Sequence, residues 1–100
     1  MNLLETYKLP IFKLCEKHSV KSLYAFGSIL TDNFNSESDI DLMVDFAPIK
    51  VEDYADNYFD FKFSLQDILN RPIDLLEEKA IKNPYFKTAV LNQRALVYGK

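Results

Sequence analysis

The feature that most constrains the fold is the segment 39–46, in which apolar residues alternate with residues that are mostly acidic. The even positions hold Ile40, Leu42, Val44 and Phe46, and the odd positions hold Asp39, Asp41, Met43 and Asp45. A period of two is typical of a β-strand that buries one face. The segment therefore predicts a half-buried strand, with the Cα atoms of Asp39 and Asp41 on one face and roughly 6.6 Å apart.

Two carboxylates this close repel each other unless a cation neutralises them. Oxygen ligands of this kind suit Mg²⁺, and two such ions about 3.5–4 Å apart would hold the attacking and leaving oxygens of a displacement at phosphorus. Taken alone, Asp39 and Asp41 are more often part of a solvated strand face. The neighbouring motifs decide between the two interpretations.

The first neighbouring motif is Gly27-Ser28, which lies ten residues before the acidic pair. Residues 22–26 are apolar enough to predict a short buried strand, and a polar segment follows at 28–35. Glycine permits a tight turn and a close approach of the backbone. If a helical turn begins at Ser28, its free N–H groups and hydroxyl could contact a triphosphate.

The second neighbouring motif is the segment 71–76, in which Asp74 interrupts an apolar run that predicts another strand. If this strand lies beside the acidic strand, Asp74 would face the same metal ions and could orient or deprotonate a nucleophile. Asp45 and Asp67 are weaker candidates, because Asp45 is near the end of its strand and Asp67 falls in an expected helix.

Taken together, Gly27-Ser28, Asp39-Ile40-Asp41 and Asp74 resemble the minimal nucleotidyltransferase (MNT) family. The resemblance spans about residues 22–76 in motif terms, and the chain length matches across nearly all 100 residues. It implies an α+β polymerase β-like fold, with helices packed on a mixed β-sheet of about four strands. It also implies that the three aspartates bind the metal, and that Gly27 and Ser28 contact phosphate.

The resemblance further implies a reaction and a partner. Members of this family are Mg²⁺-dependent, with two ions expected, and transfer a nucleoside monophosphate, here AMP from ATP, to a hydroxyl. Small stand-alone members pair as antitoxins with HEPN-domain toxins, in which case the acceptor would be a tyrosine of the toxin.

Two other functions remain open. Many relatives carry an Arg-rich turn after the Gly-Ser pair, where this chain has apolar and polar residues at 29–34. A module that neutralises a HEPN toxin by contact alone is therefore a second hypothesis. The third is an antibiotic-modifying transferase, although such enzymes usually carry an additional helical domain.

Composition limits the remaining possibilities. One hundred residues, 48% of them hydrophobic, fit a single domain spanning residues 1–100. A net charge of −3 without a basic stripe argues against direct binding of nucleic acid. The single cysteine, Cys15, excludes an intrachain disulfide and predicts a buried thiol. No secretory or membrane-spanning pattern is present, so we expect a cytoplasmic protein. The sequence leaves homo- or hetero-oligomers open.

The remaining pattern predicts helices and one further strand. Helices are expected at 10–17, with Ile11, Leu14 and Cys15 on one face, at 51–69, and after Asn83, which is a candidate N-cap before Pro84. Residues 95–98 predict a short strand. His18 is interpreted as a capping or solvated residue at a helix end rather than a catalytic one.

The helix expected at 51–69 contains more aromatic residues than one face can bury. Its predicted apolar face consists of Val51, Tyr54, Ala55, Tyr58, Leu65, Ile68 and Leu69. Tyr58, Phe59, Phe61 and Phe63 are too close in sequence to share one side of a helix. Their surplus indicates either a crowded core or a surface for a protein partner.

Overall fold

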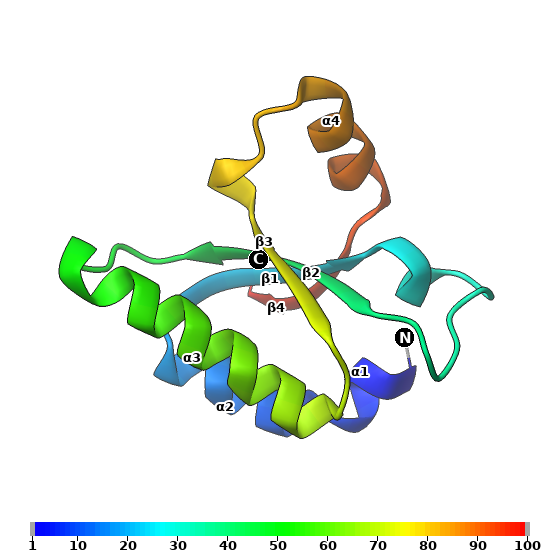
Figure 1. The fold of residues 1–100 in the computed structure, drawn as a ribbon, viewed down its shortest axis with the longest axis horizontal. Helices are drawn as coiled ribbons and strands as arrows, with labels where there is room; N and C mark the ends of the chain where they lie inside the picture. The colour runs from blue at the N-terminus through cyan, green and yellow to red at the C-terminus, as the bar shows by residue number, and fades with distance from the viewer. Residues whose placement is uncertain (1, 100) are drawn as a thin grey trace.

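A computed structural model describes residues 2–99 and shows a four-stranded mixed sheet with helices on both faces (Figure 1). The elements are, in chain order, α1 (Asn2–Thr6), α2 (Lys8–Lys17), β1 (Val20–Phe26), the 3₁₀ turn η1 (Gly27–Leu30), β2 (Ile40–Phe46), α3 (Val51–Leu69), β3 (Ile73–Glu77), the 3₁₀ turn η2 (Glu78–Ala80), α4 (Pro84–Gln93) and β4 (Ala95–Gly99). This arrangement confirms the predicted α+β class.

The strand order is β3-β2-β1-β4. β1 pairs antiparallel with β2 and with β4, whereas β2 pairs parallel with β3. The parallel pair needs a crossover connection, which α3 supplies. The acidic strand β2 is therefore central, and its partner is the strand that carries Asp74.

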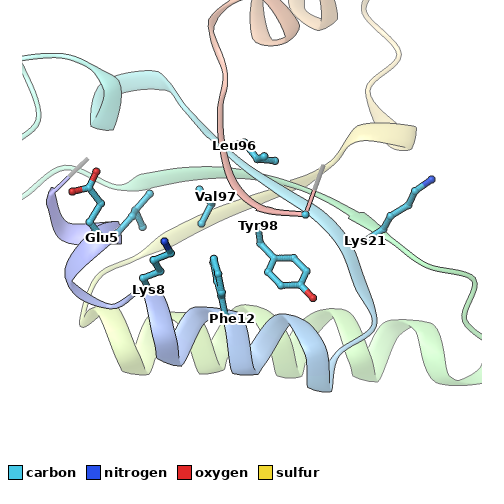
Figure 2. A pocket seen from close by; sticks show the side chains of 9 residues that line it. Glu5, Lys8, Phe12, Lys21, Leu96, Val97 and Tyr98 are labelled. Carbon is cyan, nitrogen blue, oxygen red and sulfur yellow. The ribbon is translucent and has the colours of Figure 1, made fainter.

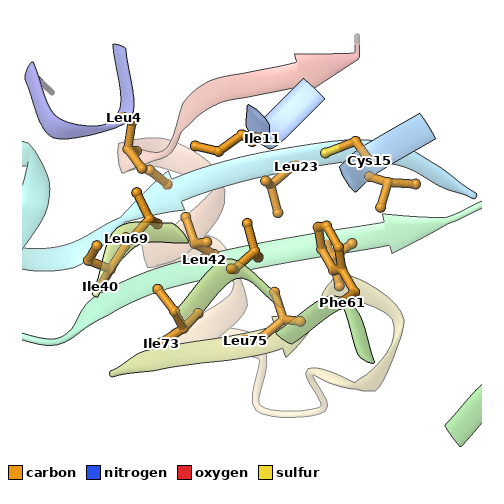
Figure 3. Close-up of a cluster of buried hydrophobic side chains, with 14 of the residues drawn as sticks. Leu4, Ile11, Cys15, Leu23, Ile40, Leu42, Phe61, Leu69, Ile73 and Leu75 are labelled. Carbon is orange, nitrogen blue, oxygen red and sulfur yellow. The ribbon is translucent and has the colours of Figure 1, made fainter. Parts of the chain in front are cut away.

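The main core lies between the sheet and the helices α2 and α3, below the sheet in Figure 1. Figure 3 shows this cluster, which includes Leu4, Ile11, Cys15, Leu23, Ile40, Leu42, Phe61, Leu69, Ile73 and Leu75. The even residues of β2 point into it, as the alternation predicts. Cys15 is fully buried, and burial raises the pKa of its thiol to about 12.

A smaller cluster covers part of the opposite face of the sheet. Phe26, Met43 and Val90 form it, and Val90 comes from α4. Met43 is thus buried, although the alternation places it among the polar positions of β2. The face that carries the odd residues of β2 is open where the aspartates lie and covered where Val90 of α4 packs on Met43.

Most element predictions agree with the structure. The 51–69 helix has the predicted bounds, and the Asn83 side chain caps α4 by accepting hydrogen bonds from the N–H groups of Tyr85 and Phe86. α2 begins at Lys8 rather than at Pro10, and α1 was not predicted. The expected strand at 95–98 is β4, which extends to Gly99.

The predicted apolar face of α3 needs correction. Val51 and Ala55 are exposed, whereas Phe61 is fully buried. Phe59 and Phe63 are half exposed and stack on each other, with ring centroids 5.9 Å apart. The core therefore accepts Phe61 and leaves the other two at the surface.

His18 caps α2 but is not solvated, which corrects that part of the prediction. Its imidazole is buried, Nδ1 lies 2.8 Å from the carbonyl oxygen of Leu14, and Nε2 lies 2.8 Å from Asp60 Oδ2. It links the end of α2 to α3. Among residues 2–99, no helix combines the length and the apolar character needed to cross a membrane.

Candidate active site

The site is built where the neighbouring strands β2 and β3 begin. Asp41 and Asp74 are directly paired in the parallel register, and Asp39 immediately precedes β2. Ile40 and Ile73 point into the core. Because side chains alternate along a strand, the aspartates that follow them, Asp41 and Asp74, point to the other face. Asp39 and Asp74 are exposed and Asp41 is half-buried, which leaves all three within reach of a solvated ligand.

Gly27 brings the turn η1 against the acidic pair. Its φ of +76° lies in the region that L side chains rarely adopt. A Cβ at this position would clash with Asp41 Oδ2. Glycine is therefore required twice, once for the backbone conformation and once for the close approach of Asp41. Ser28 follows within the predicted helical turn.

The carboxylates affect one another electrostatically. The pKa of Asp41 is raised above its ordinary value, first by partial burial and then by the charges of Asp74 and Asp39. Loss of solvent and two like charges both disfavour its ionised form. A cation between these groups would reverse that effect.

In the described part of the chain, no three His, Cys, Asp or Glu side chains are arranged closely enough to form a metal centre by themselves. The chemistry of the three aspartates nevertheless fits a hard cation, because all of the donors are carboxylate oxygens. The pKa of Asp41 is raised first by burial and then by the charges of Asp74 and Asp39, and a cation would offset the effect of those charges. Substrate phosphate and water can complete the coordination of Mg²⁺.

The two weaker acidic candidates lie elsewhere. Asp45 is on the same face of β2 but four residues farther along, with Lys79 Nζ 3.6 Å from its Oδ1. Asp67 is exposed on α3, on the opposite side of the sheet. The fold thus groups Asp41 and Asp74 and leaves Asp67 apart.

Comparisons with known proteins agree with this geometry. The profile of the nucleotidyltransferase domain matches residues 12–97. The chain belongs to the nucleotidyltransferase domain family. It is 38% identical over 85 residues to the candidate protein adenylyltransferase MJ0128 of Methanocaldococcus jannaschii, which covers 85% of this chain and 82% of that protein. The candidate protein adenylyltransferase MJ1379 of the same organism is 35% identical, with the same coverage of both chains.

Solved structures share the fold of this nucleotidyltransferase domain. A candidate minimal nucleotidyltransferase superposes with a TM-score of 0.75 at 24% identity and covers 92% of this chain and 93% of its own. A toxin–antitoxin crystal structure with AMP-PNP gives a TM-score of 0.72 at 21% identity, covering 93% of this chain and 73% of that one. The complex of a tri-AMPylated HEPN toxin of Shewanella oneidensis with an MNT antitoxin gives a TM-score of 0.67 at 19% identity. The match covers 97% of this chain and 73% of the matched chain.

Arg71 lies beside the candidate site, and the sequence analysis did not single it out. Its Nη1 donates to the carbonyl oxygens of Asn35 at 2.7 Å and Ser38 at 3.2 Å, and its guanidinium lies 4.5 Å from the ring centroid of Phe34. Arg71 therefore fastens the loop that leads to Asp39 onto the loop that leads to β3. Its position three residues before Asp74 was the only sequence signal.

Two side chains of α3 hold β3 in place on either side of Asp74. Gln66 Oε1 accepts a hydrogen bond from the N–H of Ile73 at 3.3 Å, and the Tyr58 hydroxyl donates to the carbonyl oxygen of Leu75. β3 is an edge strand, so these contacts satisfy groups on its unpaired side. They were missed because each joins a helix to a strand, which the periodicity of neither element predicts.

A cavity of about 600 Å³ lies away from the aspartates, between the first two helices and β4 (Figure 2). Its lining includes Glu5, Lys8, Phe12, Lys21 and Tyr98. None of the residues predicted for nucleotide or metal binding contributes to it. The cavity is therefore separate from the candidate active site.

Proposed function

We propose that the chain is a Mg²⁺-dependent adenylyltransferase that transfers AMP from ATP to a tyrosine hydroxyl of a HEPN-domain toxin and thereby acts as its antitoxin. The observation that carries this proposal is the pairing of Asp41 with Asp74 on adjacent strands, with Gly27 packed against Asp41. The nucleotidyltransferase profile and the relatives named as candidate protein adenylyltransferases support it.

In the proposed reaction the acceptor oxygen attacks the α-phosphorus of ATP. A new bond between oxygen and phosphorus forms, the bond between the α-phosphorus and the oxygen bridging to the β-phosphate breaks, and pyrophosphate leaves. In this proposal Asp74 orients the acceptor hydroxyl and receives its proton, and its exposed position beside Asp41 supports that role. The half-buried Asp41 is suited to bind the cation.

The group that the site would hold is Mg²⁺. Asp39 and Asp41 would bind it, with Asp74 as a third carboxylate, and two ions are expected. When bound, Mg²⁺ supplies positive charge that offsets the negative charge developing on the phosphoryl oxygens. The charges of Asp39 and Asp74 that raise the pKa of Asp41 are those that it would neutralise.

Gly27 and Ser28 are proposed to contact the phosphates. Because Gly27 has no side chain, the backbone of η1 can lie against Asp41 and leave space for a triphosphate beside it. The choice of ATP is supported by the structural neighbour that was crystallised with AMP-PNP.

The proposed partner and acceptor are inferred from the neighbours. One is an MNT antitoxin in complex with a tri-AMPylated HEPN toxin, which supplies both the partner class and the modification. A tyrosine acceptor follows from the family resemblance. The chemistry is consistent with it, since a phenol hydroxyl can be approached by Asp74 at an open face.

One observation favours a second candidate, an antitoxin that acts by binding alone. The turn η1 carries Ile29, which is buried in the main core, and Leu30, which packs against it. Neither side chain can bind phosphate. Weak ATP binding would leave association with the toxin as the inhibitory step.

The experiment is an AMP-transfer assay with α-labelled ATP, Mg²⁺ and a HEPN-domain protein from the same genome. We expect the wild type to label the HEPN protein and Asp41→Asn to lower the rate by more than about 100-fold, the upper end of the cost of losing an outer-shell partner of a metal. Asp67→Asn, which alters an exposed carboxylate on α3, is the matched control.

The possible outcomes separate the two candidates. Label on the HEPN protein that depends on Asp41 and on Mg²⁺, together with loss of the toxin's activity, supports the enzyme. Tight association and inhibition without label in any variant would support the binding antitoxin. Equal labelling by the wild type and by Asp41→Asn would contradict the proposed site.

A further inference from the structure

The helix α4 is the most exposed helix of the described chain in relation to its length. Among its ten residues only Val90 is buried. The exposed fractions of Tyr85, Phe86 and Leu91 are 86%, 43% and 37%. Three apolar side chains on one short helix exceed what its own packing explains, and exposed apolar surface of this kind marks interaction sites.

The helix is nevertheless fixed beside the candidate active site. Phe86 contacts the buried Phe26 edge to face, with ring centroids 6.4 Å apart, and Phe26 is the register partner of Asp41. Val90 packs on Met43, which lies on the same face of β2 as Asp41. α4 therefore lies on the face of the sheet opposite α2 and α3 (Figure 1), which is the face that carries Asp41.

The N-terminal end of α4 is capped, and its C-terminal end is held against β1 and η2. Asn83 caps its N-terminus, and Arg94, just beyond its C-terminus, lies over the Tyr24 ring at 3.8 Å. Arg94 Nη1 also lies 2.7 Å from Glu78 Oε1. A capped helix that packs through Phe86 and Val90 and is held at its C-terminal end presents its side chains with little further loss of entropy, which favours binding.

The charge of this segment differs from that of the whole protein. Residues 79–93 contain three lysines and no acidic residue, whereas the chain has a net charge of −3. Lys79 lies near Asp45, which leaves Lys82 and Lys87 as exposed cations beside the apolar side chains. A complementary surface would have an apolar pocket with acidic groups at its rim.

We propose that α4 is the docking surface for the protein that supplies the acceptor hydroxyl. Tyr85 and Leu91 enter an apolar pocket of that protein, and Lys82 and Lys87 pair with carboxylates around it. This inference rests on the proposed function, because it assigns the acceptor's route to the same site. A protein fits better than RNA, since two lysines next to an acidic site neutralise few phosphates.

The test compares two triple variants of the full chain. The α4 variant is Tyr85→Ser/Lys87→Glu/Leu91→Ser. The control makes the same kinds of change on the opposite side of the sheet. It is Phe59→Ser/Lys62→Glu/Phe63→Ser on α3, where the two phenylalanines are 49% and 53% exposed. Equal melting temperatures would show that both variants are folded.

Association with the HEPN-domain protein is measured by calorimetry, and AMP transfer is measured at several partner concentrations. We expect the α4 variant to raise the dissociation constant by about 10- to 100-fold, as truncation of interface anchors does. Transfer should slow when the partner is scarce and recover when it is saturating. The α3 control should match the wild type in both assays.

Other outcomes would overturn the inference. The inference is wrong if the α4 variant binds the HEPN-domain protein as tightly as the wild type does, or if the wild type does not bind it. It is also wrong if the α4 variant loses only its binding to a single-stranded RNA probe. A wild-type homodimer that the α4 variant disrupts would assign the surface to a second copy. If the α4 variant loses association but neither it nor the wild type transfers label, the docking surface is supported and the proposed reaction is contradicted.

Discussion

The two faces of the sheet come from the same strands but differ in what covers them. On one face the even residues of β2 pack under α2 and α3, and Ile40, Leu42 and Val44 are almost completely buried. On the other face Asp41 is half-buried and Asp39 and Asp74 are exposed, and α4 covers part of the surface. The alternation of β2 thus separates a structural face from a functional one.

The comparison shows how a chain of 100 residues can carry clustered negative charge. Burial of apolar groups on the closed face supplies stability, since each fully buried large side chain contributes about 1.5–3 kcal/mol. The open face keeps carboxylates near water, where an unpaired charge costs far less than in the interior. Stability and chemistry are therefore sensitive to different residues.

The largest expected effect is on the closed face. Phe61 is fully buried, with its ring centroid 6.0 Å from that of Phe46 and 5.5 Å from that of His18. Phe61→Ala should lower the free energy of unfolding by about 3–5 kcal/mol. The same change at Phe63, two residues along the same helix and 53% exposed, should cost much less. Urea unfolding measures both, and equal losses would contradict the division between the faces.

A smaller effect is expected where the turn η1 meets the open face. Gly27→Ala places a Cβ against Asp41 Oδ2 and forces alanine into a left-handed conformation, which costs about 1–2 kcal/mol. We expect a lower free energy of unfolding and a large loss of AMP transfer, because the Asp41 carboxylate must move. Thermal denaturation and the transfer assay measure the two effects.

Gly27→Asn separates the two causes. Asparagine tolerates a positive φ better than alanine does, but it has the same Cβ. It should recover part of the stability without recovering transfer. Full transfer by either variant would show that the close approach of Gly27 to Asp41 is not needed.

The sequence predicted the local features of both faces better than their long-range contacts. The alternation in β2, the bounds of α3 and the Asn83 cap follow from periodicity and capping, which depend on residues close in sequence. The placement of Asp74 beside Asp41 was a condition of the site hypothesis, and the parallel register meets it. The catalytic and metal-binding roles of these residues stay predictions.

What the sequence did not predict depends on which surfaces meet in three dimensions. Met43 is buried because Phe26 and Val90 pack around it, and Val51 is exposed at the first residue of α3. Arg71 bonds to a loop more than 30 residues away, and His18 pairs with Asp60. Residue type and spacing along the chain contain no signal for such contacts.

The smallest expected effect concerns the pH dependence of the open face. The pKa of Asp41 is raised in the folded chain by partial burial and by Asp74 and Asp39. Between the ordinary aspartate pKa, about 4, and the raised folded pKa, the native state binds more protons than the unfolded state, so stability falls as pH rises through that window. The amide introduced by Asp41→Asn does not titrate, so the variant lacks this fall in stability with rising pH.

The stability of Asp41→Asn relative to the wild type should therefore increase as pH rises above about 4 and level off above the folded pKa of Asp41. Urea unfolding between about pH 4 and 7.5 measures this difference, with Asp67→Asn as the exposed control. Mg²⁺ at neutral pH should stabilise the wild type and reduce the advantage of the variant, because a bound cation favours the ionised carboxylate. An advantage that declines with rising pH would show that the open face holds Asp41 in its charged form without a metal.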